Sequence, residues 1–110
     1  EKRLSRRGMT IVTAPDGQSA LDIVTEAMKQ PETMFQVVVM DVRMPGMDGL
    51  ETLRHMKKIA PKLPVLLLTG HASLGVAVQG MDLGAYDYML KPVAINELII
   101  KMEEAVRAAA

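Results

Sequence analysis

The stretch "VVVMDVRMPGMDG", residues Val37–Gly49, carries an unbroken apolar run directly into Asp41 and then into a turn rich in Pro and Gly. Continuous apolar runs of this kind are typical of strands covered on both faces of a parallel sheet. In open parallel sheets, ligands and reacting groups gather at the carboxyl ends of the strands. Asp41 is therefore the first candidate for a functional residue.

Strand patterns and helix patterns alternate along the whole chain. The apolar runs predict strands at Met9–Ala14, Phe35–Val42, Pro64–Thr69 and Ala85–Leu90. Apolar residues at helical spacing, with the stop signals around them, predict helices at residues 1–8, Gly17–Gln30, Gly49–Ala60, Ser73–Leu83 and Ile95–Ala109. Alternation of this kind implies right-handed crossovers and helices on both faces of one parallel sheet. We therefore expect a single α/β domain over residues 1–110, with a doubly wound parallel sheet.

The composition is that of an ordinary globular chain without net charge. It contains 13 Lys and Arg residues, 13 Asp and Glu residues and no cysteine. A balanced charge provides no overall field for holding nucleic acid, and no apolar run approaches the roughly 18 residues of a membrane span. The lack of cysteine excludes disulfides and thiolate metal sites. We expect a cytoplasmic protein that binds neither nucleic acid nor a membrane through this domain.

Polar side chains end the apolar strands. Asp41, Thr69 and Lys91 each stand at the carboxyl end of a predicted strand, so parallel pairing would bring them to one edge of the sheet. A carboxylate can attack phosphorus and become an acyl phosphate. An ammonium group and a hydroxyl can then neutralise the phosphoryl oxygens and donate hydrogen bonds to them. The three residues together indicate a phosphoryl-transfer site.

The segments "VVVMDVRMPGMDGLETL", "PVLLLTGHA" and "LGAYDYMLKP" resemble the receiver (CheY-like) domain of two-component response regulators. The similarity runs through essentially the whole chain, in the same order and spacing. It implies a flavodoxin-like fold and a phosphoacceptor that takes its phosphoryl group from a sensor histidine kinase or a phosphotransfer protein. Asp41 matches the acceptor aspartate, Thr69 the switch hydroxyl and Lys91 the lysine that pairs with the phosphoryl group.

The same resemblance implies roles for residues around this centre. Pro92 matches the position of a cis-proline, and Tyr88 matches an aromatic switch that turns in or out with phosphorylation. Arg43 and His71, each two residues after a site residue, match positions that influence the lifetime of the phosphoryl group. Gly70 matches a position where small residues leave space beside that group.

A bound Mg²⁺ is also implied by the resemblance, with Asp41 and the backbone carbonyl of Arg43 among its ligands. The family supplies the other ligands as an acidic pair after a first strand, and this chain contains neither. In the family's sheet order, that strand is central and lies between Met9–Ala14 and Phe35–Val42. We expect that the sequence is truncated at its N-terminus, and the alternative is that a second chain, as in a homodimer, supplies the strand by exchange.

Three functions follow from these patterns. The first is a phosphorelay signalling domain in which phosphorylation of Asp41 changes the surface of the last two helices and the strand between them. Gly75 and Gly80 would soften the helix that has to move, although they could equally allow close packing. The second is a degenerate receiver that dimerises or docks without phosphorylation. The third, a phosphate-ester hydrolase, is disfavoured because Arg43 stands where such enzymes need a second acid, so we do not expect a turnover enzyme.

Overall fold

The computed structural model describes residues 12–43 and 48–109, and within them the chain forms one parallel sheet. Its order is β1 (Val38–Asp41), β2 (Val65–Thr69) and β3 (Asp87–Leu90), with β2 in the middle. The register pairs Asp41 with Leu68 and Thr69 with Leu90. The carboxyl ends of all three strands therefore lie at one edge of the sheet.

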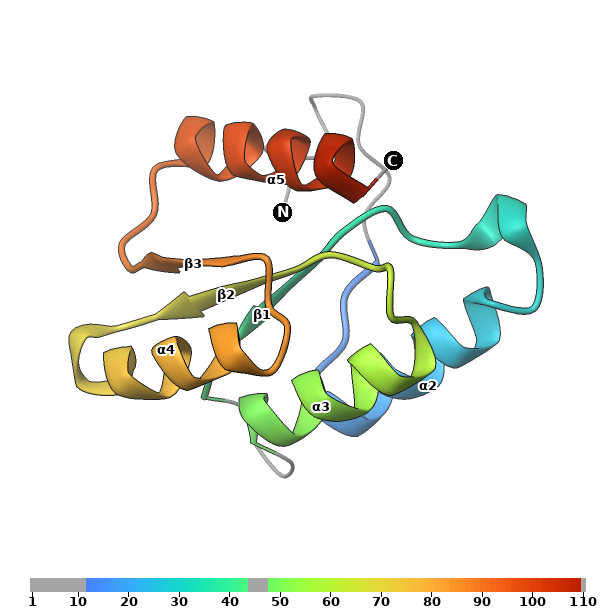
Figure 1. Cartoon of the computed structure of the whole chain (residues 1–110), viewed down its shortest axis with the longest axis horizontal. Coiled ribbons are helices and arrows are strands. Elements are labelled where there is room, and N and C mark those ends of the chain that lie inside the picture. The colour runs from blue at the N-terminus through green and yellow to red at the C-terminus, as the bar shows by residue number, and fades with distance from the viewer. Residues whose placement is uncertain (1–11, 44–47, 110) are drawn as a thin grey trace.

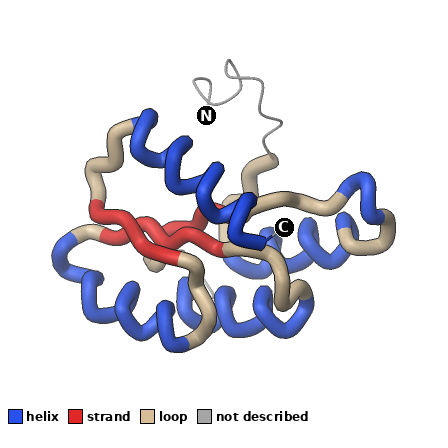
Figure 2. The backbone as a smooth tube through the Cα atoms, turned by 45° about the horizontal axis from the view of Figure 1, so that its top comes forward, coloured by secondary structure: helices blue, strands red, loops and turns tan. Residues whose placement is uncertain are grey.

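Helices cover both faces of this sheet. They are α2 (Gly17–Ala27), α3 (Gly49–Ile59), α4 (Leu74–Asp82) and α5 (Ile95–Ala109), with short 3₁₀ turns η1 (Pro31–Thr33) and η2 (His71–Ser73). Figure 1 shows α5 on one face and α2, α3 and α4 on the other, and Figure 2 shows the sheet between these layers. The doubly wound α/β arrangement expected from the sequence is confirmed. No helix of the described segments is long and apolar enough to cross a membrane.

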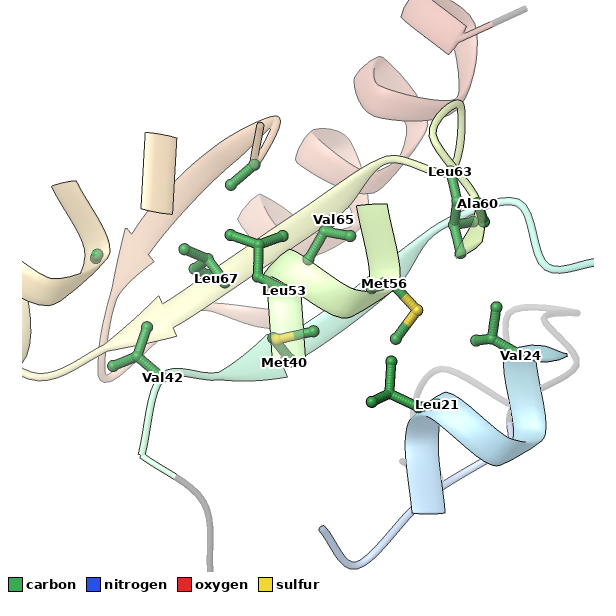
Figure 3. Close-up of a cluster of buried hydrophobic side chains, with 12 residues drawn as sticks. Leu21, Val24, Met40, Val42, Leu53, Met56, Ala60, Leu63, Val65 and Leu67 are labelled. Carbon is green, nitrogen blue, oxygen red and sulfur yellow. The ribbon is translucent and has the colours of Figure 1, made fainter. Parts of the chain in front are cut away.

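The main core lies between the sheet and the layer of α2, α3 and α4. Leu53 and Met56 of α3 and Val65 and Leu67 of β2 have no exposed surface, and they belong to the same buried cluster as Leu21 from α2 (Figure 3). Side chains alternate between the two faces of a strand, so Leu66 points from β2 to the opposite face, which α5 covers. Burial of this central strand on both faces explains its unbroken apolar sequence.

A close backbone contact fixes the start of α3 beneath the site. A Cβ atom on Gly49 would lie 2.6 Å from the Cα and the carbonyl oxygen of Val42, which only a glycine avoids. Asp48 caps the helix, because its carboxylate accepts a hydrogen bond of 2.8 Å from the Glu51 N–H. The loop that follows Asp41 is therefore held firmly at its far end.

Several element boundaries differ from the sequence predictions. The helix predicted over Gly17–Gln30 ends at Ala27, because Gln30 precedes Pro31 and adopts an extended conformation, with φ −137° and ψ 126°. The prediction for α3 was wrong by one residue at its C-terminal end, since α3 stops before Ala60, and the prediction for α4 was wrong by one residue at each end, since α4 excludes Ser73 and Leu83. The prediction for α5 is confirmed.

The strands are shorter than the apolar runs that predicted them. β1 begins at Val38 instead of Phe35 because β2, its partner, begins opposite it at Val65. Pro64 belongs to no strand, although its carbonyl accepts a hydrogen bond of 2.9 Å from the Val38 N–H. Similarly, β3 begins at Asp87, opposite Leu66, instead of at Ala85. The partner strand thus accounts for the start of β1, whereas β3 begins one residue after the level of Val65, where β2 begins.

The strand predicted over Met9–Ala14 is wrong for its described part. Val12, Thr13 and Ala14 form no strand, and Val12 is 55% exposed. Within the described residues they pair with no strand of the sheet, which consists of β1, β2 and β3. The helix predicted at residues 1–8 and the Pro-Gly turn at 44–47 lie outside the described residues.

Candidate functional site

Asp41 and Lys91 meet at the carboxyl edge of the sheet. Asp41 is the last residue of β1, and Lys91 directly follows β3, two strands away in the sheet. The Lys91 Nζ donates a hydrogen bond to Asp41 Oδ2 and forms an ion pair with it. The Asp41 side chain remains 35% exposed, so the carboxylate is open to a reagent from solvent. The structure thus brings these two residues together at the carboxyl edge of the sheet.

The surroundings keep the Asp41 carboxyl ionised. Partial burial raises the pKa of Asp41, but hydrogen bonds from Lys91 and from the Arg43 N–H, together with the positive charges of both side chains, lower it by more in sum. The bond from the Arg43 N–H to Oδ1 measures 2.9 Å. The net pKa lies below the ordinary value, so the carboxylate can act as a nucleophile at neutral pH without a general base.

Thr69 lies at the same edge, but its hydroxyl points elsewhere. Its Oγ1 donates a hydrogen bond of 2.9 Å to the carbonyl of Gly70, and the residue has no exposed surface. Its own carbonyl accepts a hydrogen bond of 2.7 Å from the Lys91 N–H, which ties β2 to the residue after β3. Thr69 is thus linked to Lys91 by a backbone hydrogen bond, whereas its hydroxyl is bonded to the carbonyl of the next residue, Gly70.

Pro92 and Gly70, which directly follow Lys91 and Thr69, have the geometry that the sequence led us to expect. The Lys91–Pro92 peptide bond is cis. A Cβ atom built on Gly70 would meet no heavy atom within 4 Å, so there is open space beside this residue. A small side chain here leaves room next to Asp41 and Lys91.

Arg43 bridges two loops. Its backbone N–H bonds to Asp41, and its Nε donates a hydrogen bond to the hydroxyl of Ser73, thirty residues away. Ser73 is only 3% exposed and ends the turn η2, immediately before α4. Ser73 is not among the residues selected from the sequence; its one signal is a serine at the start of the predicted helix Ser73–Leu83, a residue type that favours helix N-termini.

The other two predicted residues lie near the site without a side-chain bond to Asp41. His71 is exposed at the start of η2. Tyr88 is half-buried in the middle of the β3 sequence and packs against the core cluster. Its backbone N–H donates a hydrogen bond of 2.8 Å to Asp87 Oδ1. His71 thus lies just beyond the carboxyl end of β2 and Tyr88 lies within β3, opposite Leu67, and their predicted roles stay predictions.

The described residues do not by themselves form a magnesium site. Mg²⁺ requires about six oxygen ligands in an octahedron. Within residues 12–43 and 48–109, no group of three or more acidic, His or Cys side chains could hold a metal ion. Both oxygens of Asp41 also accept hydrogen bonds already. Asp41 and the Arg43 carbonyl supply too few ligands alone.

The chain matches a known family over nearly all of its length. A model of the response regulator receiver domain matches residues 1–103. Over 106 residues, the chain is 39% identical to the DNA-binding transcriptional regulator NtrC of Escherichia coli (strain K12), with 96% of this chain and 21% of NtrC covered. It is 40% identical over 106 residues to the response regulator MprA of Mycolicibacterium vanbaalenii, with 96% of this chain and 43% of MprA covered. The chain thus spans about a fifth of one relative and less than half of the other.

Solved structures agree with the sequence matches. The receiver domain of NtrX from Brucella abortus superposes with a TM-score of 0.84 at 34% identity, covering 94% of this chain and 83% of that one. A response regulator receiver domain protein from Clostridium thermocellum gives a TM-score of 0.86 at 35% identity, covering 96% and 80%. Both similarities extend over the elements that carry Asp41, Thr69 and Lys91.

Proposed function

Because this chain belongs to the response regulator receiver domain family, we propose that it takes a phosphoryl group from a phosphohistidine onto Asp41. The observation that carries the proposal is the contact of Asp41 with Lys91 at the carboxyl edge of the sheet. An ionised, accessible carboxylate beside an ammonium group is suited to attack on phosphorus. The donor is a sensor histidine kinase or a phosphotransfer protein.

The transfer step involves Asp41, Lys91 and the phosphorylated imidazole of the donor. An oxygen of Asp41 forms the new bond to phosphorus, while the bond between phosphorus and the imidazole nitrogen of the donor breaks. That nitrogen keeps the electron pair and takes up a proton, and Asp41 becomes an acyl phosphate. Lys91, now beside a phosphoryl group with more negative charge than the free carboxylate, stabilises the charge that develops on its oxygens.

Phosphorylation then switches an output surface. Rotation of the Thr69 hydroxyl from the Gly70 carbonyl toward a phosphoryl oxygen would replace a neutral hydrogen bond by a charge-assisted one. Thr69 is followed directly by η2 and α4, and Tyr88 lies in the neighbouring strand β3. The surface made by α4, β3 and α5, which exposes Val78, Met81, Leu90 and Ile100, is the one that we expect to change.

Mg²⁺ belongs to this proposal as a cofactor of the complete domain. Asp41 and the Arg43 carbonyl would be two of its ligands, and the others would have to come from outside the residues described here. When bound, the ion would neutralise phosphoryl charge. We also propose that the protein is cytoplasmic and that it acts as a signal carrier with self-catalysed transfer and hydrolysis at Asp41, not as a turnover enzyme.

The test is phosphorylation of the complete gene product with acetyl phosphate and Mg²⁺, followed by intact and peptide mass spectrometry. We expect one phosphoryl group, located on Asp41, and none in the Asp41→Asn variant. Asp87→Asn, which removes a second lysine-paired carboxylate of this chain, is the matched control and should be labelled normally. Absence of label on the unaltered protein, or label that survives in Asp41→Asn, would disprove the proposal.

A second candidate is a receiver that dimerises or docks without phosphorylation. Two observations favour it: both Asp41 oxygens are engaged in hydrogen bonds, and the described residues offer no acidic cluster for a metal. The same mass measurement separates the two candidates. Size-exclusion chromatography of the unlabelled protein would then show whether it dimerises or exchanges a strand.

A further inference from the structure

The first turn of α4 differs from those of α2 and α3 in how it is capped. Asp16 and Asp48 cap α2 and α3, each accepting a hydrogen bond of 2.8 Å from a backbone N–H of the first turn. Ser73 stands at the corresponding position of α4 and is a residue type well suited to capping. Its side chain nevertheless makes no capping hydrogen bond.

The hydroxyl of Ser73 has another partner. It accepts a hydrogen bond from Arg43 Nε, and this contact is partly buried, because Ser73 is almost fully buried while Arg43 is exposed. Its backbone, with φ −111° and ψ 10°, is not in the extended conformation of a capping residue. Ser73 can therefore cap α4 only if Arg43 withdraws and the turn η2, which directly follows Thr69 and Gly70, changes its conformation.

Arg43 has a reason to withdraw when Asp41 is modified. Its positive charge already acts on the Asp41 carboxyl and contributes to the lower pKa of that group. A phosphoryl group adds about one to two further negative charges at that point. A guanidinium group binds such an anion through paired, charge-assisted hydrogen bonds, which are stronger than a bond to a neutral hydroxyl.

We propose that Ser73 is a positioning residue whose hydroxyl exchanges between Arg43 and the first turn of α4, so that Arg43 transmits the state of Asp41 to this helix. The inference rests on the proposed phosphorylation of Asp41 and adds a route that does not pass through Thr69 and Tyr88. In the unmodified protein, Arg43 withholds Ser73 from α4. After phosphorylation, Arg43 turns to the phosphoryl group, and Ser73 caps the helix at Gly75 or Val76.

Gly75 suits this exchange. A Cβ atom built on it would meet no heavy atom within 4 Å, so close packing does not require a glycine at this position. Gly80 differs, because a Cβ there would clash with the Leu67 side chain in the core. Packing therefore requires a glycine at position 80 but not at position 75. The glycine in the first turn serves instead to leave the backbone free to change conformation.

The test measures backbone hydrogen exchange at residues 75–77 in the complete gene product, before and after phosphorylation. We expect protection of these amides to rise about fivefold on phosphorylation, the size of a typical capping hydrogen bond. In Ser73→Ala the rise should be absent, and in Ser73→Thr, which keeps the hydroxyl, it should be retained. In Arg43→Lys, which lacks Nε, protection should already be high without phosphorylation.

Arg54→Lys, on the exposed face of α3, is the matched control and should behave as the unaltered protein. An unchanged rise in Ser73→Ala, or low protection in unmodified Arg43→Lys, would overturn the inference. If Asp41 takes no label at all, the proposed function fails and the transmission of its state fails with it. Hydrogen exchange at residues 75–77, compared between unphosphorylated Arg43→Lys and the unaltered protein, would still show whether Arg43 prevents Ser73 from capping α4.

Discussion

Two aspartate–lysine pairs of this chain have the same local chemistry and lie in different parts of the sheet. Asp41 accepts hydrogen bonds from the Arg43 N–H and from Lys91. Asp87 accepts them from the Tyr88 N–H and from Lys101, whose Nζ lies 3.0 Å from Oδ2. Each carboxylate therefore binds one backbone N–H and one ammonium group, with about a third of its side chain exposed.

The position of each pair in the sheet separates their roles. Asp41 ends β1, so its carboxylate stands at the edge where the loops diverge and leave space for a reagent. Asp87 begins β3, at the opposite edge, and its lysine comes from α5. Lys101 also lies 3.4 Å from Glu104 of its own helix. The comparison teaches that the place in the fold, and not the local pairing, makes Asp41 the proposed acceptor, whereas Asp87 and Lys101 connect α5 to the sheet.

The largest effect is expected from removing the lysine of each pair in turn. Lys91→Ala should slow phosphorylation of Asp41 by about 10²-fold or more, since a charge-stabilising donor is lost from the transition state. Lys101→Ala should leave the rate unchanged. The rate of mass increase with acetyl phosphate measures both. Equal losses of phosphorylation rate in Lys91→Ala and Lys101→Ala would contradict the different roles given to the two pairs.

The order of the two pairs should be reversed for stability, where the Asp87–Lys101 pair should matter more. Asp87→Asn should lower the free energy of unfolding by up to about 1 kcal/mol, the range for a partly exposed ion pair, because β3 and α5 lose their connection. Asp41→Asn should have a smaller effect, since Lys91 is 45% exposed and stays hydrated. Urea unfolding monitored by circular dichroism gives both values. A greater loss in Asp41→Asn would show that the site pair also supports the fold.

The pair at Lys101 predicts a dependence on alkaline pH. The hydrogen bond to Asp87 and the charge of that residue, with a smaller contribution from Glu104, raise the pKa of Lys101. A raised pKa contributes stability that is complete below the unfolded-state value of about 10.4 and is lost as pH rises through the folded-state value. The stability advantage of the unaltered protein over Lys101→Met should therefore stay constant from neutral pH up to about pH 10 and shrink above it. An advantage that does not change with pH would contradict this origin.

The smallest effect is expected for the acid titration of Asp41. Its pKa lies below the ordinary 3.8, so the stability from its ionised form is present above the unfolded-state value and is lost as pH falls through the folded-state value. Carbon-13 NMR of the Asp41 carboxyl should show the low midpoint, and Lys91→Met should raise it. An unchanged midpoint in Lys91→Met would mean that Lys91 does not lower the pKa of Asp41.

The sequence predicted the order of the elements better than their ends. Ile95–Ala109 was correct because its apolar spacing is regular and its boundaries depend on local signals. The start of β1 was placed three residues early, at Phe35, since nothing in the apolar run shows where β2 begins to offer hydrogen bonds. Val12–Ala14 show the same limit, because a strand-like sequence forms no strand without a neighbour to pair with.

For the site, the sequence by itself determined that Asp41 and Lys91 would meet. Both stand at the carboxyl end of an apolar run that predicts a strand, and parallel connections bring such positions to one edge of the sheet. Only the tertiary structure decided that the Thr69 hydroxyl bonds to the Gly70 carbonyl and that Ser73 bonds to Arg43. The physical reason is that periodicity constrains which residues share an edge or a face, whereas the direction of a polar side chain depends on which donors and acceptors the packed loops bring within reach.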